Sequence, residues 1–228
     1  MDPPEVTVSF NGTHFHSINT FLFDLDGTLI DSLDLHIEAF QWVLNQLGKS
    51  VARETLEPLM GRTPQDIIKQ FFADMSREEL LHAARLKEDK LAEIIDHVYV
   101  YPHIQPFLQE LKRLGLKLIV ISSTHKKLVE ILLQKAGLLP YLDDIVSGDE
   151  VKNGKPDPEP FALGVQKAKS ISSKAVAIGD SVHDYQSAIA AGVNFIGILT
   201  GKTEKQTFVE YGLTNLISNI NELSLQVL

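Results

Sequence analysis

The sequence of 228 residues contains no cysteine. This absence excludes disulfide bonds, thiolate nucleophiles and metal sites built on cysteine. The sequence also has no apolar run that approaches the ~20 residues needed to cross a bilayer. Residues 1–5 are acidic and proline-bearing, whereas a secretory signal begins with basic and then apolar residues. We therefore expect a soluble protein in the cytoplasm, with no membrane partner.

Basic residues are in the minority. The chain has 21 lysines and arginines against 30 acidic residues, which gives a formal net charge of −9 at pH 7. Such a chain is poorly suited to neutralising the phosphates of a nucleic acid, so we expect no nucleic-acid partner. An anionic ligand can still bind, but it needs local hydrogen-bond donors or a metal ion. The length and the hydrophobic fraction of 44% are sufficient for a large buried core.

Two kinds of pattern alternate after Pro102. Short apolar runs are typical of buried strands, and between them apolar residues recur at helical spacing. The predicted strands there are 116–121, 145–146, 175–178 and 195–198, and the predicted helices are 106–114, 126–136, 159–168 and 184–191. A further predicted strand, 21–25, precedes a helical segment. Continuous apolar strands joined by amphipathic helices indicate an α/β fold, a doubly wound parallel sheet with helices on both faces. We assign this core to residues 18–32 and 101–228.

Residues 33–100 have a different, helical character. The first run of helical spacing ends at Gly48, and Ser76 with Glu79 forms a capping-box signature before the last run. The predicted helices are 33–47, 63–72 and 76–97. The sequence therefore predicts an all-helical cap domain that is inserted into the sheet domain.

Residues 1–17 are predicted to form an N-terminal extension. Apolar and polar residues alternate around Asn11-Gly12, and both of these residues tolerate the positive φ of a hairpin turn. We therefore expect a β-hairpin in this extension. His14 and His16 lie two positions apart, but without a third nearby ligand we interpret them as exposed strand residues rather than metal ligands.

Two carboxylates follow the first strand of the predicted core. Asp24 and Asp26 stand directly after an apolar run and are followed by Gly27 and Thr28. Two like charges at the mouth of a buried strand repel each other unless a cation or a reaction uses them. The carboxyl ends of the strands are also where open parallel sheets bind their ligands. We therefore interpret this segment as catalytic.

Further polar residues fall at the ends of other predicted strands or in nearby loops: Ser122, Ser123, Lys155, Asp180 and Asp184. Together with the first two carboxylates they supply acids, a hydroxyl and an ammonium, a set that suits phosphoryl transfer to an aspartate. A carboxylate can attack a phosphate ester only if the repulsion between the two anions is offset. Mg²⁺ prefers carboxylate and water oxygens and can offset it, and Asp24 and Asp180 fit as ligands.

In their order these segments resemble the haloacid dehalogenase superfamily. The resemblance rests on Asp24-Leu25-Asp26-Gly27-Thr28, on Ser122 after a strand, on Gly154-Lys155-Pro156, and on Gly179-Asp180-Ser181-Val182-His183-Asp184. It covers about residues 20–200 and is specific as a set. The chain is most similar to the branch of phosphoglycolate phosphatases and beta-phosphoglucomutases, which carries a helical cap at this place. The resemblance implies a Mg²⁺-dependent phosphatase that hydrolyses a small phosphorylated metabolite through an aspartyl phosphate.

The resemblance also implies a role for each catalytic residue. Asp24 would attack phosphorus, and Asp26 would protonate the leaving oxygen and later activate water. Ser122 would hydrogen-bond the phosphoryl group. Lys155 would neutralise charge between the nucleophile and the phosphate.

The same resemblance implies a metal site and a substrate site. Asp24, the backbone carbonyl of Asp26, and Asp180 would bind Mg²⁺, while Asp184 would support that site or hold Lys155. The residues expected to contact the substrate are Thr28, Ser123, Arg62 and His36. A guanidinium fork suits an anionic or hydroxyl group, although a surface arginine that opens a helix is an equal interpretation of Arg62.

Two other functions remain open. A sugar-phosphate mutase of the beta-phosphoglucomutase type is favoured by His36, which stands 12 positions after Asp24. The residues at Thr28, Arg62 and Gly179 differ from that group and favour the phosphatase. The second alternative is a catalytically idle protein that keeps the fold for binding or regulation, because a fold does not fix a function. Phosphoglycolate-like acids and sugar phosphates are both candidate substrates, and the oligomeric state is left open.

Overall fold

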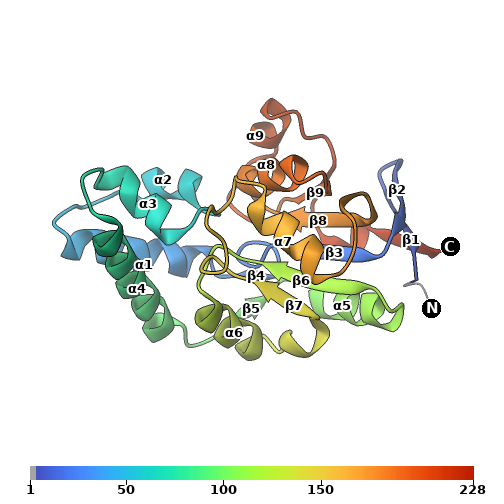
Figure 1. The fold of residues 1–228 in the computed structure, drawn as a ribbon, viewed down its shortest axis with the longest axis horizontal. Coiled ribbons are helices and arrows are strands. Elements are labelled where there is room, and N and C mark those ends of the chain that lie inside the picture. Colours follow the sequence, from blue (N-terminus) through green and yellow to red (C-terminus); the bar gives the residue numbers. More distant parts are fainter. Residues whose placement is uncertain (1–3) are drawn as a thin grey trace.

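The computed structural model describes residues 4–228, and its centre is a parallel sheet of six strands (Figure 1). The order of the strands is β10-β9-β8-β3-β6-β7. Their bounds are β3 Thr20–Phe23, β6 Lys117–Ile121, β7 Asp144–Val146, β8 Ala175–Gly179, β9 Asn194–Ile198 and β10 Leu216–Ile217. The α/β doubly wound sheet that the sequence predicts is confirmed.

Helices cover both faces of this sheet because alternate strand residues face opposite sides. In β3, Phe21 and Phe23 belong to one buried cluster and Leu22 belongs to another. Helices α5 and α6 pack in the first cluster, and α7, α8 and α9 pack in the second. The bounds are α5 Ile104–Arg113, α6 Lys126–Lys135, α7 Glu159–Lys167, α8 Val182–Ala190 and α9 Lys205–Glu210. The two groups of helices therefore cover opposite faces of the sheet.

The helices between residues 33 and 94 lie to one side of the sheet and form the cap (Figure 1). Their bounds are α1 Leu33–Gln46, α2 Arg53–Leu56, α3 Pro64–Phe71 and α4 Arg77–Ile94. The three long helices agree with the sequence patterns, and the expected capping box of Ser76 and Glu79 is present at α4. These helices share a buried cluster of their own, which includes Ile37, Phe40 and Ile68. The limits 18–32, 33–100 and 101–228 stay a prediction.

The chain enters and leaves the cap through two short strands that pair with each other. Strand β4 (Ile30–Asp31) is antiparallel to β5 (Tyr99–Val100), with Ile30 opposite Val100. Single 3₁₀ turns lie at Glu57–Leu59, Leu139–Tyr141, Ser172–Lys174 and Ile220–Glu222. The paired crossings place the cap over the carboxyl edge of the sheet. None of the helices within 4–228 combines the length and the apolar character of a membrane span.

The predicted N-terminal hairpin is present, and residues 1–3 of the extension lie outside the described residues. Strands β1 (Val6–Phe10) and β2 (Thr13–Ile18) are joined at Asn11-Gly12, where both residues have a positive φ. A third strand, β11 (Ser224–Val227), pairs with β1 in a separate small sheet. The exposed rings of His14 and His16 stack on each other, and no metal-binding cluster is found there within the described chain.

Candidate active site

The structure gathers the predicted site residues at the carboxyl edge of the sheet. Strand β3 pairs with β6 on one side and with β8 on the other. Because parallel strands end at the same edge, the residues that follow these three strands meet there. These residues are Asp24 and Asp26 after β3, Ser122 and Ser123 after β6, and Asp180 after β8.

Lys155 reaches this edge from the loop before α7. Its Nζ atom lies 2.5 Å from Oδ1 of Asp24, 2.6 Å from Oδ1 of Asp184 and 2.8 Å from the carbonyl oxygen of Ile121. Burial alone would lower the pKa of Lys155, but Asp184 and Asp24 together raise it above its usual value. The side chain is therefore a permanent ammonium at neutral pH, and it holds the two carboxylates together.

Three carboxylates form the site's candidate metal ligands. Each of Asp24, Asp180 and Asp184 is buried and offers an oxygen atom, and these atoms all lie within 4.8 Å of one another. Burial and then Asp184 raise the pKa of Asp24 to about 7, and burial and then Asp24 raise the pKa of Asp180. The ammonium of Lys155 does not balance three carboxylates, so the site favours an additional cation.

The loops around Asp180 pack closely against its carboxylate. A Cβ atom on Gly27 would lie 2.4 Å from Oδ2 of Asp180, and one on Gly201 would lie 1.7 Å from the same atom. Both positions therefore need glycine. Thr28 donates a hydrogen bond of 3.2 Å to Oδ1 of Asp180. The donor set is made of carboxylate oxygens, which fits Mg²⁺.

Asp184 has two tasks in the structure. Its backbone N–H donates to the Ser181 hydroxyl (3.1 Å), and its Oδ2 accepts from the Ser181 backbone N–H (3.2 Å), which together form a capping box at the start of α8. Its Oδ1 faces Lys155. The second task agrees with one of the two roles expected from the sequence.

Asp26 is held by donors of its own. Ser32 donates to its Oδ1 at 2.5 Å, and Ser122 donates to its Oδ2 at 3.5 Å. Nε2 of His36 lies 3.1 Å from the same Oδ1, without the alignment of a good hydrogen bond. Burial would raise the pKa of Asp26, but His36 and Ser32 outweigh it and hold the pKa at about 2. Asp26 is therefore ionised in this conformation.

The sequence analysis missed a lysine behind His36. Lys87 of α4 is 0% exposed, and its Nζ lies 2.8 Å from Nδ1 of His36 and 4.7 Å from the centre of the Phe40 ring. Burial lowers the pKa of Lys87 to about 8. An ammonium can only donate, so Nδ1 of His36 accepts and Nε2 carries the proton that faces Asp26. The signal in the sequence is that Lys87 stands on the buried face of α4, with Leu80, Ala83, Ala84 and Leu91.

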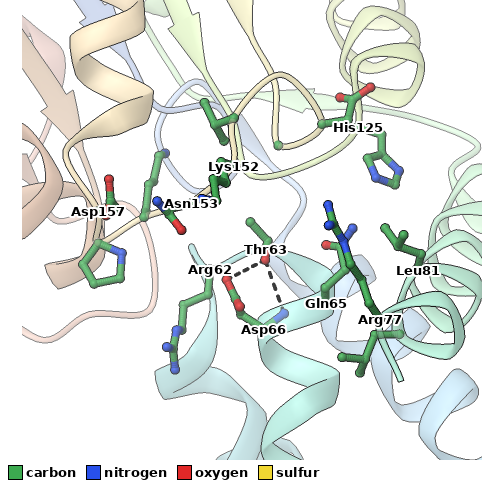
Figure 2. A pocket seen from close by; sticks show the side chains of 17 residues that line it. Arg62, Thr63, Gln65, Asp66, Arg77, Leu81, His125, Lys152, Asn153 and Asp157 are labelled. Carbon is green, nitrogen blue, oxygen red and sulfur yellow. Dashed lines mark hydrogen bonds between the residues drawn. The ribbon is translucent and has the colours of Figure 1, made fainter. Parts of the chain in front are cut away.

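Within residues 4–228, three cavities lie between the cap and the core, and one of them, of ≈ 320 Å³, is lined by Asp26 and Asp180 among others. A chamber of ≈ 30 Å³ is lined by Asp24, Asp26, His36 and Lys87, among others. A wider groove of ≈ 640 Å³ lies beside it, between α3 and α4 of the cap and the loop 148–157 of the core (Figure 2). Arg62 lines both. The chamber and the groove therefore meet at the cap loop.

The cap loop closes the chamber. The Ser123 hydroxyl donates a hydrogen bond of 2.6 Å to the carbonyl oxygen of Gly61, so Ser123 contacts the cap in this conformation. The buried Nε of Arg62 has no hydrogen-bond acceptor within 4–228. A buried donor without an acceptor is costly, and a ligand oxygen in the chamber would satisfy it.

The chain is similar to a family of hydrolases and to named phosphatases. Residues 21–198 match the family described as haloacid dehalogenase-like hydrolase. Pyrophosphatase PpaX of Bacillus pumilus is 32% identical over 183 residues, which are 80% of this chain and 83% of that protein. Phosphorylated carbohydrates phosphatase of Thermotoga maritima is 27% identical over 199 residues, which are 86% of this chain and 92% of that protein.

The solved structures show the same fold. A variant of CbbY from Rhodobacter sphaeroides, in complex with xylulose-(1,5)bisphosphate, superposes with a TM-score of 0.76 at 26% identity. The superposition covers 88% of this chain and 93% of that chain. The family match spans every motif that the structure gathers at the edge of the sheet, and the chain belongs to the haloacid dehalogenase-like hydrolase family.

Proposed function

We propose that this protein is a Mg²⁺-dependent phosphatase that hydrolyses a small phosphorylated metabolite through a phosphoryl group carried by Asp24. The observation that supports this most directly is the position of Lys155, which lies 2.5 Å from Asp24 within the buried carboxylate cluster. A nucleophile for an anionic substrate needs cations beside it. The relatives named as a pyrophosphatase and as a carbohydrate phosphatase support the same reaction class.

The carboxylates of Asp24, Asp180 and Asp184 fit the ligand set of Mg²⁺. The carbonyl oxygen of Asp26 would be a further ligand. When bound, Mg²⁺ supplies positive charge that offsets the repulsion between the phosphate and the attacking carboxylate. The hydroxyl of Thr28 fixes the carboxylate of Asp180 by donating a hydrogen bond to it.

In the first step a carboxylate oxygen of Asp24 forms a bond to phosphorus, and the bond from phosphorus to the ester oxygen breaks. The leaving oxygen takes a proton from Asp26. Asp26 is ionised in this conformation, with a pKa of about 2. A phosphate dianion beside it would raise that pKa, because a nearby like charge disfavours the ionised form, and so would favour uptake of the proton.

In the second step water attacks phosphorus and gives a proton to the Asp26 carboxylate. The bond between phosphorus and Asp24 breaks, and phosphate leaves. Ser122, whose hydroxyl donates to Asp26 in this conformation, would hydrogen-bond the phosphoryl oxygens. Lys155 would hold Asp24 in position throughout. The closed cap keeps bulk water away, so that Asp26 selects the attacking molecule.

Arg62 and His36 would contact the part of the substrate that leaves. Arg62 has the unsatisfied Nε donor at the chamber, and His36 lies between Lys87 and Asp26. Ser123 would do so only after the cap loop releases its hydroxyl. A cytoplasmic location and the lack of a nucleic-acid partner stay predictions from the composition.

The proposal is tested by phosphate release from a panel of phosphoglycolate-like acids, sugar phosphates and pyrophosphate, with and without Mg²⁺. We expect release only with Mg²⁺, and a loss of at least about 10³-fold in Asp24→Asn. Asp143→Asn is the control, because Asp143 pairs with Lys112 and Lys117 at the opposite edge of the sheet. Undiminished release by Asp24→Asn would contradict the proposal. No release from any compound would favour the binding or regulatory alternative.

A sugar-phosphate mutase is the second candidate, and the contact between His36 and Asp26 favours it. A mutase must return the phosphoryl group to a sugar hydroxyl, which requires a group that moves protons beside the acid. Isomerisation of beta-glucose 1-phosphate, measured beside phosphate release, separates the two. A phosphatase gives free phosphate and no glucose 6-phosphate.

A further inference from the structure

The chamber at Asp24 is too small for a substrate in this conformation. Its volume of ≈ 30 Å³ has room for about two water molecules. A phosphorylated metabolite therefore fills this chamber only when the cap moves away from the core, and the chemistry needs the cap to return. The contacts that hold the cap closed thus bear on turnover.

One ionic contact joins the cap to the core beside the chamber. Oε1 of Glu88, on α4 of the cap, accepts a hydrogen bond of 3.0 Å from the backbone N–H of His125. The other oxygen of Glu88 contacts Nδ1 of the His125 ring. His125 is the residue that precedes α6 in the core, so the carboxylate also lies at the positive end of that helix.

Glu88 is only 8% exposed, and both of its carboxylate oxygens contact His125. The groups that face His125 are Glu88 and Arg85 from α4 and Asp149 from the loop after β7. The hydrogen bond with Glu88 raises the pKa of His125 above its usual value, with support from Asp149 and opposition from Arg85. The contact is therefore an ion pair at mildly acidic pH.

Glu88 is also the neighbour of Lys87 on the same helix turn. Lys87 contacts His36, which lies against Asp26. The contact of Glu88 with His125 consequently fixes the positions of Lys87 and His36 relative to Asp26. Without the contact between Glu88 and His125, Lys87 and His36 would move away from Asp26 whenever the cap opens.

We propose that Glu88 is a positioning residue that closes the cap on the core through His125 and so places Lys87 and His36 against Asp26. Closure of the cap by Glu88 does not depend on the reaction, whereas the effect of this closure on turnover rests on the proposed phosphatase function. The ion pair between Glu88 and His125 thus acts on the cap without contact to substrate or metal.

The absence of cysteine gives a direct test. Cysteines introduced as Gln70→Cys on the cap and Lys127→Cys on the core, both exposed positions, carry a fluorescence energy-transfer pair. We expect one short-distance population at pH 6 in the otherwise unchanged protein, and at least about tenfold more of the long-distance population in Glu88→Gln. Glu78→Gln, on an exposed face of the same helix, should match the unchanged protein.

The pH dependence separates an ion pair from simple packing. The open population should rise as the pH rises through the pKa of His125, because the ring then loses its charge. Glu88→Gln and His125→Gln should both lose this dependence, while His125→Gln keeps the backbone contact to Glu88 and stays partly closed. Equal distances and equal pH profiles in Glu88→Gln and the unchanged protein would overturn the proposal.

Phosphate release provides a second test of the proposal. In an active enzyme we expect kcat to fall about tenfold in Glu88→Gln and to lose its decline as the pH rises through the pKa of His125. An unchanged kcat and pH profile would show that Glu88 does not position the acid. If the unmodified protein releases no phosphate, the proposed function fails, while the distances still decide whether Glu88 closes the cap.

Discussion

Lys155 and Asp24 form an ion pair of 2.5 Å in which the side chains are 1% and 7% exposed. Lys155 also lies 2.6 Å from Asp184. A buried ammonium between two carboxylates can be removed only by leaving those charges unpaired or by adding protons to them. This relationship links the stability of the core to the chemistry of the site.

Replacement of the lysine should affect both properties. In Lys155→Met we expect the free energy of unfolding at pH 7 to fall by about 3 kcal/mol, and phosphate release to fall by at least about 10²-fold. Urea unfolding and steady-state kinetics measure the two. Lys167→Met is a matched control, because Lys167 also bridges two carboxylates but lies away from the site at 18% exposure. A similar loss of activity in both variants would count against a catalytic position for Lys155.

Metal binding should stabilise the fold even without substrate. An ion that binds only the folded state at a hundred times its dissociation constant stabilises it by about 2.7 kcal/mol. We therefore expect Mg²⁺ to raise the Tm of the protein and EDTA to reverse the rise. Asp180→Asn should lose most of this response, and Asp143→Asn should keep it. The same Mg²⁺ response in Asp180→Asn would remove Asp180 from the ligand set.

The buried charge of Lys87 should lower the free energy of unfolding at neutral pH. Its pKa is lowered to about 8 by burial, so below that pH the folded protein carries a buried charge. Lys87→Met should raise the free energy of unfolding by roughly 1–3 kcal/mol at pH 7 and lower kcat, because His36 loses its donor. The folded pKa lies below the unfolded value, so the unmodified protein gains stability between about pH 8 and 10.5 and the difference shrinks there.

Lys90→Met on the same helix is the comparison, since Lys90 is partly exposed over the Trp42 ring. It should change neither quantity by much. Urea unfolding across pH 6–10 is the measurement. A destabilised Lys87→Met would mean that the contacts of Lys87 with His36 and Phe40 outweigh the burial of its charge.

The close approach of the cap loop depends on Gly61. Its φ is +92°, and a Cβ atom there would lie 2.8 Å from the Ser181 hydroxyl oxygen. Gly48 has a similar φ of +85° but open space around it. Alanine at either position should lower the free energy of unfolding by about 1 kcal/mol. Only Gly61→Ala should also lower kcat, and equal kinetics in the two variants would contradict the closure that the structure shows.

Sequence patterns located most of the fold because the periods of strands and helices are local properties. Strand β11 was missed because it depends on pairing across nearly the whole chain, with Val227 opposite Val6. Strands β4 and β5 have two residues each, which is too short to show a period. Long-range pairing and very short elements leave no pattern in a sequence window.

The candidate site divides in the same way. Asp24 and Asp180 meet as expected because the geometry of a parallel sheet determines which strand ends are neighbours. Lys87 lies on the apolar stripe of α4, but a lysine on such a stripe commonly extends its charge to the surface. Only the tertiary position of His36 shows where the ammonium lies. Glu88 and His125 likewise come together only through the packing of the cap on the core.

The central claim is that Asp24 carries the phosphoryl group, and chemical trapping tests it most directly. Borohydride reduces an acyl phosphate to an alcohol, so quenching during turnover should convert residue 24 to homoserine, detectable by peptide mass spectrometry. We expect this product only with substrate present, and none in Asp24→Asn. A phosphoryl group found on another residue, or full turnover by Asp24→Asn, would contradict the account.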